Sequence, residues 1–150
     1  MEYEDAMAKA IEIARAAATV NGDVPVGAII LDAKNEVIST GVNQRELMKN
    51  PIAHAEIVAI EKAASALNNW RLDGCTLIVT LEPCAMCAGA IAQSRISKLI
   101  FGAWDEKAGA VGSKWDLLRD PRQIYKPEVV SGLLAEECAT LLTGFFEEKR

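Results

Sequence analysis

The chain has 150 residues, 51% hydrophobic and 25% charged, which is typical of one ordinary globular domain, and we expect that domain to span residues 1–150. No apolar run approaches the roughly 18 residues of a membrane span, and the acidic start MEYEDAMAKA does not resemble a signal peptide. We therefore expect a cytoplasmic protein with no membrane partner. The formal net charge of −5 argues against generic nucleic-acid binding.

The first half of the chain predicts two helices and a hairpin. Residues 3–19 place apolar side chains at spacings of three and four, which indicates an amphipathic helix. Two β-branched segments, 24–32 and 37–43, are separated by the turn AKNE and predict a hairpin. Residues 54–67 follow Pro51 and are rich in strong helix formers, so they predict a second helix.

The second half of the chain alternates strands and helices. Residues 75–81, CTLIVTL, form a short continuous apolar segment of the kind that is buried on both faces of a sheet. Residues 83–94 begin with a proline at an expected first helical position and predict a helix. Two further strands, 98–103 and 128–132, and a closing amphipathic helix, 134–149, are also predicted. This alternation implies parallel strands with helices on the faces of the sheet.

A histidine and two cysteines form the candidate metal site. His54 is the only histidine, and a single histidine between two alanines is most often an ordinary residue of a helix start. Cys84 and Cys87 change this interpretation, because positions i and i+3 in a first helical turn lie on one side, where the helix dipole lowers thiol pKa values. Together the three residues supply the ligand number of a catalytic zinc with one open position. We predict one zinc ion per chain.

Glu56, two residues after His54, is the candidate catalytic residue. Positions i and i+2 do not share a helical face, so Glu56 approaches the site without being a ligand only if the helix begins at an irregular turn. Zinc lowers the pKa of bound water to about 7, and a neighbouring carboxylate can pass its proton to a substrate nitrogen. The order H-A-E and then P-C-x-x-C at the next helix start is the pattern of zinc deaminases that act on nucleobases.

Over nearly its full length the chain resembles bacterial tRNA-specific adenosine deaminases of the TadA type, within the cytidine-deaminase-like superfamily. The matching segments are VPVGAII, GVN, AHAEIVA, WRLDGCTLIVTLEPCAMCAGA, SRI, FGAWDEKAGAVGS and GLLAEECATLL, and the combination of TLEPCAMCAGA with KAGAVGS is the most specific feature. The resemblance implies an α/β fold, a three-layer α/β/α sandwich with a five-stranded mixed sheet, and a homodimer. It also implies hydrolytic conversion of adenosine to inosine at the wobble position of a tRNA anticodon loop.

The resemblance also suggests substrate contacts in the anticodon stem-loop. Asn43 is expected to hydrogen-bond the base, since an amide both donates and accepts; an ordinary turn residue at a strand end is the alternative. Asp105 and Lys107 match positions near bound RNA in the family, or are solvated loop charges. Trp104 beside them either stacks on a base or packs at the dimer interface. The segment 93–127 has seven basic and four acidic residues, and this local charge of +3 is either a solvated surface or a site of RNA contact.

One position departs from the family pattern. Tyr125 stands where relatives carry a histidine before the last strand. The substitution is either neutral change in a wet loop or a sign of altered substrate contact. Trp70 and Trp115 are expected to be partly buried structural aromatics.

Two other functions remain open on the sequence alone. A free-base or nucleotide deaminase, of the guanine or cytosine type, would use the same zinc chemistry. A structural zinc module that binds RNA without catalysis would need a fourth ligand from Cys75 or Cys138 and would leave Glu56 without a purpose. We expect both of these cysteines to be core residues instead.

Overall fold

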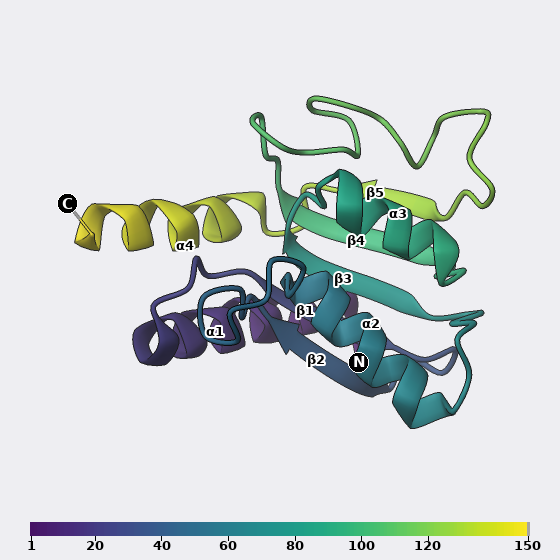
Figure 1. Ribbon diagram of the computed structural model, residues 1–150, viewed down its shortest axis with the longest axis horizontal. Helices are drawn as coiled ribbons and strands as arrows, with labels where there is room; N and C mark the ends of the chain where they lie inside the picture. The colour runs from purple at the N-terminus through teal and green to yellow at the C-terminus, as the bar shows by residue number, and fades with distance from the viewer. Residues whose placement is uncertain (150) are drawn as a thin grey trace.

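A computed structural model describes residues 1–149, in which four helices surround a five-stranded sheet (Figure 1). The helices are α1 (Tyr3–Asn21), α2 (Ala55–Leu67), α3 (Ala85–Gln93) and α4 (Ala135–Glu148). The strands are β1 (Gly27–Leu31), β2 (Val37–Val42), β3 (Thr76–Leu81), β4 (Lys98–Ala103) and β5 (Glu128–Ser131). The sequence prediction of these elements and their order is therefore confirmed.

The sheet is mixed and has the strand order β2-β1-β3-β4-β5. Strand β1 pairs antiparallel with both β2 and β3, whereas β3, β4 and β5 run parallel to one another. The predicted hairpin and the predicted parallel pairing are both confirmed. Leu81, the last residue of β3, is the register partner of Ala103, the last residue of β4. The segments that follow these two strands therefore start side by side at the carboxyl ends of the strands. The carboxyl ends of parallel strands are the usual place for a ligand site in such sheets.

Two helices cover each face of the sheet, which confirms the predicted three-layer α/β/α sandwich. Helices α2 and α3 lie on the face turned toward the viewer in Figure 1, and α1 and α4 pack on the other face. Each face of the sheet has its own hydrophobic core. Leu77 and Val79 of β3 belong to the core under α2 and α3, and Ile78 belongs to the core under α1 and α4. Strand β3, which leads to the candidate metal site, is therefore buried on both faces.

Two boundaries differ from the prediction for physical reasons. Strand β1 begins at Gly27 rather than at residue 24, because Pro25 has no N–H to give to a strand ladder. Helix α3 begins at Ala85 with Cys84 as its N-cap residue, so Pro83 precedes the cap and is not the first helical residue. The two cysteines are still three positions apart at the start of one helix.

Two surface tryptophans are more exposed than predicted. Trp70 is 60% exposed and Trp115 is 47% exposed, and each ring has a cationic side chain over it. The Arg71 guanidinium lies 5.4 Å from the Trp70 ring centroid, and the Lys114 ammonium lies 4.7 Å from that of Trp115. Within residues 1–149, none of the helices combines the length and apolar character that crossing a bilayer requires.

Candidate active site

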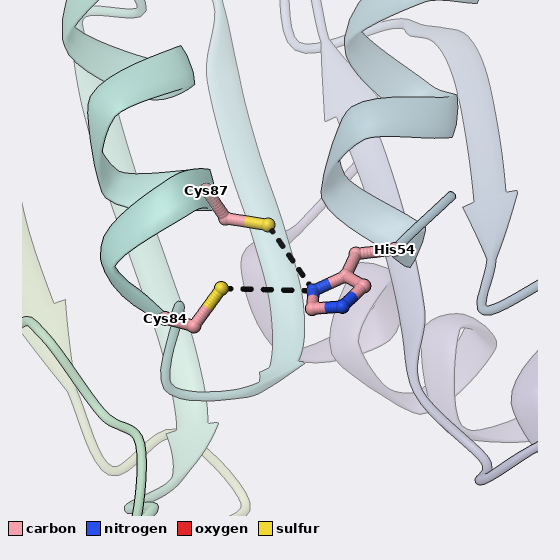
Figure 2. A group of neighbouring side chains, drawn as sticks. All are labelled: His54, Cys84 and Cys87. Atoms are coloured by element: carbon pink, nitrogen blue, oxygen red, sulfur yellow. Dashed lines mark hydrogen bonds between the residues drawn. The ribbon is translucent and has the colours of Figure 1, made fainter. Parts of the chain in front are cut away.

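Three side chains meet between the starts of α2 and α3 (Figure 2). His54 is the N-cap residue of α2, Cys84 is the N-cap residue of α3, and Cys87 lies in the first turn of α3. The His54 Nδ1 atom lies 3.6 Å from the Cys84 Sγ atom and 3.6 Å from the Cys87 Sγ atom. The structure thus brings together the three residues that the sequence singled out as ligands.

The geometry of this cluster fits zinc. Tetrahedral zinc with Zn–N of about 2.0–2.1 Å and Zn–S of about 2.3 Å separates nitrogen from sulfur by about 3.5–3.6 Å. Both observed Nδ1–Sγ distances have this value. Among residues 1–149 this is the one group of at least three histidine, cysteine, aspartate or glutamate side chains placed to hold a metal ion. One imidazole and two thiolates are typical zinc ligands, and they leave a fourth position for water or substrate.

The other two cysteines lie away from this cluster. Cys75 and Cys138 are 1% and 0% exposed and belong to the cores on opposite faces of the sheet. The prediction that both are core residues is confirmed. Neither side chain is within reach of the cluster as a fourth ligand, as a structural zinc module would require.

The two thiols of the cluster have opposite pKa shifts, so only Cys84 is held as a thiolate before a metal binds. A hydrogen bond from Cys87 lowers the pKa of Cys84 to about 4, against the effect of burial, and His54 adds to this lowering. The same hydrogen bond, together with burial, raises the pKa of Cys87 far above its usual range. The hydrogen bond with Cys84 raises the pKa of His54. A divalent cation held by these three residues would displace their protons, because it binds the thiolate and neutral imidazole forms.

Glu56 lies in the first turn of α2, outside the group of ligands but next to it. Its side chain is 4% exposed, and burial raises its pKa to about 7. The charges of His54 and Cys84 also act on it, and it contacts the Cys87 thiol. A carboxyl group with this pKa can accept and release a proton near neutral pH. The role of Glu56 as a proton carrier stays a prediction.

Backbone packing holds the start of α2 against the sheet. A Cβ atom on Gly41 would overlap the carbonyl oxygen of Ala55, so the close approach of β2 to α2 requires glycine at this position. The buried Ser39 hydroxyl donates to the carbonyl of Ala59 over 2.8 Å and ties the same two elements together. His54, directly before α2, is thereby fixed relative to the sheet.

Asn43, just after β2, is a turn residue in this structure. Its Nδ2 donates to the carbonyl of Val24 over 3.1 Å, and its Oδ1 accepts the N–H of Arg45 over 3.1 Å. These bonds use one N–H group and one lone pair, so the amide keeps a second donor and a second acceptor position. Its contact with the base stays a prediction.

The loop after β4 carries the other three candidate substrate residues. Trp104 is 52% exposed, and Lys107 is exposed with no ion-pair partner within the described chain. The Asp105 carboxylate accepts the N–H groups of Lys107 and Ala108, so it shapes the loop itself. Gly109 of this loop forms a β-bridge with Cys84, which places the loop beside the metal site.

Tyr125 lies away from the metal site. It precedes β5 at the amino ends of the parallel strands, whereas Cys84 follows the carboxyl end of β3. The Arg95 guanidinium lies 5.8 Å from the Tyr125 ring centroid. Tyr125 therefore makes a cation–π contact at the end of the parallel strands opposite to the metal site.

The basic segment 93–127 has fewer unpaired cationic side chains than its composition suggests. Three of its cationic side chains are in ion pairs, namely Lys98 with Glu128, Arg119 with Asp116 and Arg122 with Asp120. Arg119 also donates to the carbonyl of Val111 over 3.2 Å. Lys107 is consequently a better candidate for an RNA phosphate than either arginine.

Sequence reasoning missed a buried carboxylate next to the ligands. Glu82 is 2% exposed and directly follows β3, between Leu81 and Pro83. Burial works to raise its pKa, but hydrogen bonds from Ser113 and the backbone outweigh it and hold the pKa below its usual value. The available signal was a charged residue immediately after a continuous apolar strand.

Comparison with known proteins first defines the class. The family model for the cytidine and deoxycytidylate deaminase zinc-binding region matches residues 1–103. Together with the mixed sheet and the three-ligand cluster, this match defines a zinc-dependent deaminase with the cytidine-deaminase-like fold, and its cofactor is zinc.

Two curated relatives narrow that class. The chain is 49% identical over 129 residues to the tRNA-specific adenosine deaminase of Bacillus subtilis (strain 168), across 86% of this chain and 80% of the relative. It is 45% identical over 150 residues to the Haemophilus influenzae enzyme of the same name, across 99% of this chain and 86% of the relative. The chain belongs to the family of tRNA-specific adenosine deaminases.

Solved structures agree with this placement. A structure from a study of A-to-I editing by tRNA deaminases at the wobble position has a TM-score of 0.85 and 38% identity, and the match covers 91% of this chain and 98% of that one. A guanine deaminase from Nitrosomonas europaea has a TM-score of 0.79 at 27% identity, over 95% and 83% of the two chains. The fold is thus shared with an enzyme for a free base, while sequence identity is higher with the tRNA enzymes.

Proposed function

We propose that this chain is a zinc-dependent hydrolase that converts adenosine to inosine at the wobble position of a tRNA anticodon loop. The observation that carries the proposal is the cluster of His54, Cys84 and Cys87 beside the buried non-ligand Glu56. The high identity to tRNA-specific adenosine deaminases supports the choice of substrate.

In this mechanism His54, Cys84 and Cys87 would hold one zinc ion, which supplies a Lewis acid that lowers the pKa of a water molecule. Glu56 accepts a proton from that water and gives it to N1 of adenine while the water oxygen adds to C6. Glu56 then transfers the second water proton to the exocyclic amino group, which leaves as ammonia. One water is consumed, and the products are inosine and ammonia.

Four further residues would hold the anticodon loop. Asn43 would hydrogen-bond the base with the donor and acceptor that its turn contacts leave over. Trp104 offers a half-exposed indole for stacking, and Lys107 offers an unpaired cation for a phosphate. Asp105 would act indirectly: its carboxylate accepts the N–H of Lys107 and so fixes the turn that carries the Lys107 side chain.

The chain, residues 1–150, would act as a single deaminase domain and as a homodimer in the cytoplasm, where its tRNA substrate is found. Three large apolar side chains on the loop before His54 support a dimer: Leu47, Met48 and Ile52 are 53%, 60% and 49% exposed. Sedimentation equilibrium tests this point, because lysine at Leu47 and Met48 should shift the protein from dimer to monomer.

The substrate is tested by mass spectrometry of tRNA from cells that lack the protein. We expect unmodified adenosine at a wobble position that carries inosine when the protein is restored, and no rescue by the Glu56→Gln variant. Full wobble inosine in the deleted cells would contradict the proposal.

A further inference from the structure

The buried Glu82 carboxylate is bound entirely by one loop. Its Oε1 accepts the N–H of Asp105 over 3.0 Å and the hydroxyl of Ser113, and its Oε2 accepts the N–H groups of Val111 and Ser113, each over 3.0 Å. All these donors lie in residues 105–113, which follow β4, whereas Glu82 follows β3. Within residues 1–149 no cation pairs with Glu82, so hydrogen bonds alone compensate its burial.

The same loop is also bound to the segment that carries the zinc ligands. The N–H of Ala110 donates to the carbonyl of Pro83 over 2.8 Å, and Gly109 forms an antiparallel bridge with Cys84. A Cβ atom on Gly109 would overlap both the Glu82 carboxylate and the carbonyl oxygen of Asp105. The loop therefore packs on Glu82 and on the start of α3 with no room between them.

We infer that Glu82 is a positioning residue that locks the 105–113 loop onto the start of α3, and so holds the substrate contacts of the loop at a fixed place relative to the zinc ligands. The inference rests on the proposed function for the identity of the substrate, an RNA loop. Glu82 has no chemical role in this inference, because all the hydrogen bonds of its carboxylate go to residues 105–113 and it is not one of the three candidate ligands.

The donor set explains why a carboxylate is needed at this position. An ionised carboxylate only accepts hydrogen bonds, and Glu82 meets three backbone N–H groups and a hydroxyl. Glutamine has nearly the same shape, but its NH₂ group would face N–H donors at one of the two oxygen positions. At least one buried loop N–H would then lose its acceptor, and the loop should loosen locally.

The test compares Glu82→Gln with a matched control in the zinc-loaded full chain. Asp32→Asn is the control, because the Asp32 carboxylate also accepts two turn N–H bonds, from Lys34 and Glu36. The β1–β2 turn lies by the amino end of β3, whereas Glu82 follows its carboxyl end. Hydrogen–deuterium exchange, zinc per chain, and kcat and KM for an anticodon stem-loop are measured for both variants.

We expect Glu82→Gln to retain one zinc per chain and to exchange at least about tenfold faster only in peptides covering 105–113. The KM for the stem-loop should rise at least about tenfold while kcat changes less than about threefold, since Glu56 and the ligands stay in place. Ser113→Ala, which removes one of the four donors, should give a smaller effect in the same peptides. Asp32→Asn should leave this loop and KM unchanged.

Three results would overturn the inference: unchanged exchange in the loop, loss of zinc, or a loosened loop with wild-type KM. If the wild-type chain does not deaminate the stem-loop at all, the proposed function fails instead. The exchange and zinc measurements still decide whether Glu82 positions the loop, because they need no substrate.

Discussion

Replacing Glu56 with glutamine should abolish turnover while the fold and the zinc remain. The side chain is 4% exposed and glutamine has almost the same volume, so the substitution leaves no cavity. The amide cannot carry a proton, and His54, the only histidine of the chain, is a proposed ligand. General acid–base catalysis contributes about 10²–10⁴-fold, and a residue that serves several proton transfers should reach the upper end. A loss of about 10⁴-fold in kcat corresponds to about 5.5 kcal/mol of transition-state stabilisation.

The same variant has a predictable effect on stability. Burial raises the pKa of Glu56 from 4.5 to about 7, so its contribution to stability is present below pH 4.5 and is lost as the pH rises through 7. The difference of about 2.5 units sets an upper limit of about 3 kcal/mol, which a bound cation would reduce. Glutamine has no charge to bury, so at pH 8 the variant should unfold at the same temperature as the wild type or higher.

The assay is single-turnover formation of inosine in a saturating anticodon stem-loop, with zinc content and Tm measured on the same preparation. A variant that retains more than about a tenth of the wild-type rate would refute the role of Glu56 as proton carrier. Loss of zinc would show instead that Glu56 supports the metal site.

Three other outcomes are expected. A double variant with alanine at Cys75 and Cys138 should retain one zinc per chain, whereas Cys87→Ala should lose it; zinc loss in the double variant would support a structural module with a fourth ligand. Lys107→Glu should weaken stem-loop binding and flatten the slope of log K against log salt by about 0.7. The same change at Arg122, which is paired with a neighbouring carboxylate, should do less, and equal effects would contradict the assignment of the loop. Burial raises the pKa of Cys138 to about 11, so stability should fall as the pH rises from 9 to 11, by at most about 3 kcal/mol, and calorimetry should find a shallower fall in Cys138→Ala.

The elements of the fold could be predicted from periodicity and turn residues because their signals are local. Residues 75–81 form a continuous apolar segment, and the structure buries both faces of β3. The number of strands and the mixed character of the sheet came from the family resemblance. The strand order β2-β1-β3-β4-β5 was not predicted, since alternation alone does not say which strands are neighbours.

The metal site was predictable because its spacing is local to two helix starts. The role of Glu82 was not, because its partners lie 23 to 31 residues further along the chain and meet it only once β3 and β4 pair. The position of Tyr125 is a similar case, since the parallel register places it against Arg95 and away from Cys84. Composition likewise overstated the positive charge that segment 93–127 leaves unpaired, because a count of charges does not show which side chains form ion pairs.

The most direct test of the proposed function compares kcat/KM of the zinc-loaded protein for an anticodon stem-loop, free adenosine and free guanine. Binding energy from the flanking nucleotides is needed to position the base, so the stem-loop should exceed both small substrates by at least about 10²-fold. Comparable values for the stem-loop and free adenosine, or a preference for guanine, would show that the pocket alone selects the substrate and would contradict the tRNA assignment.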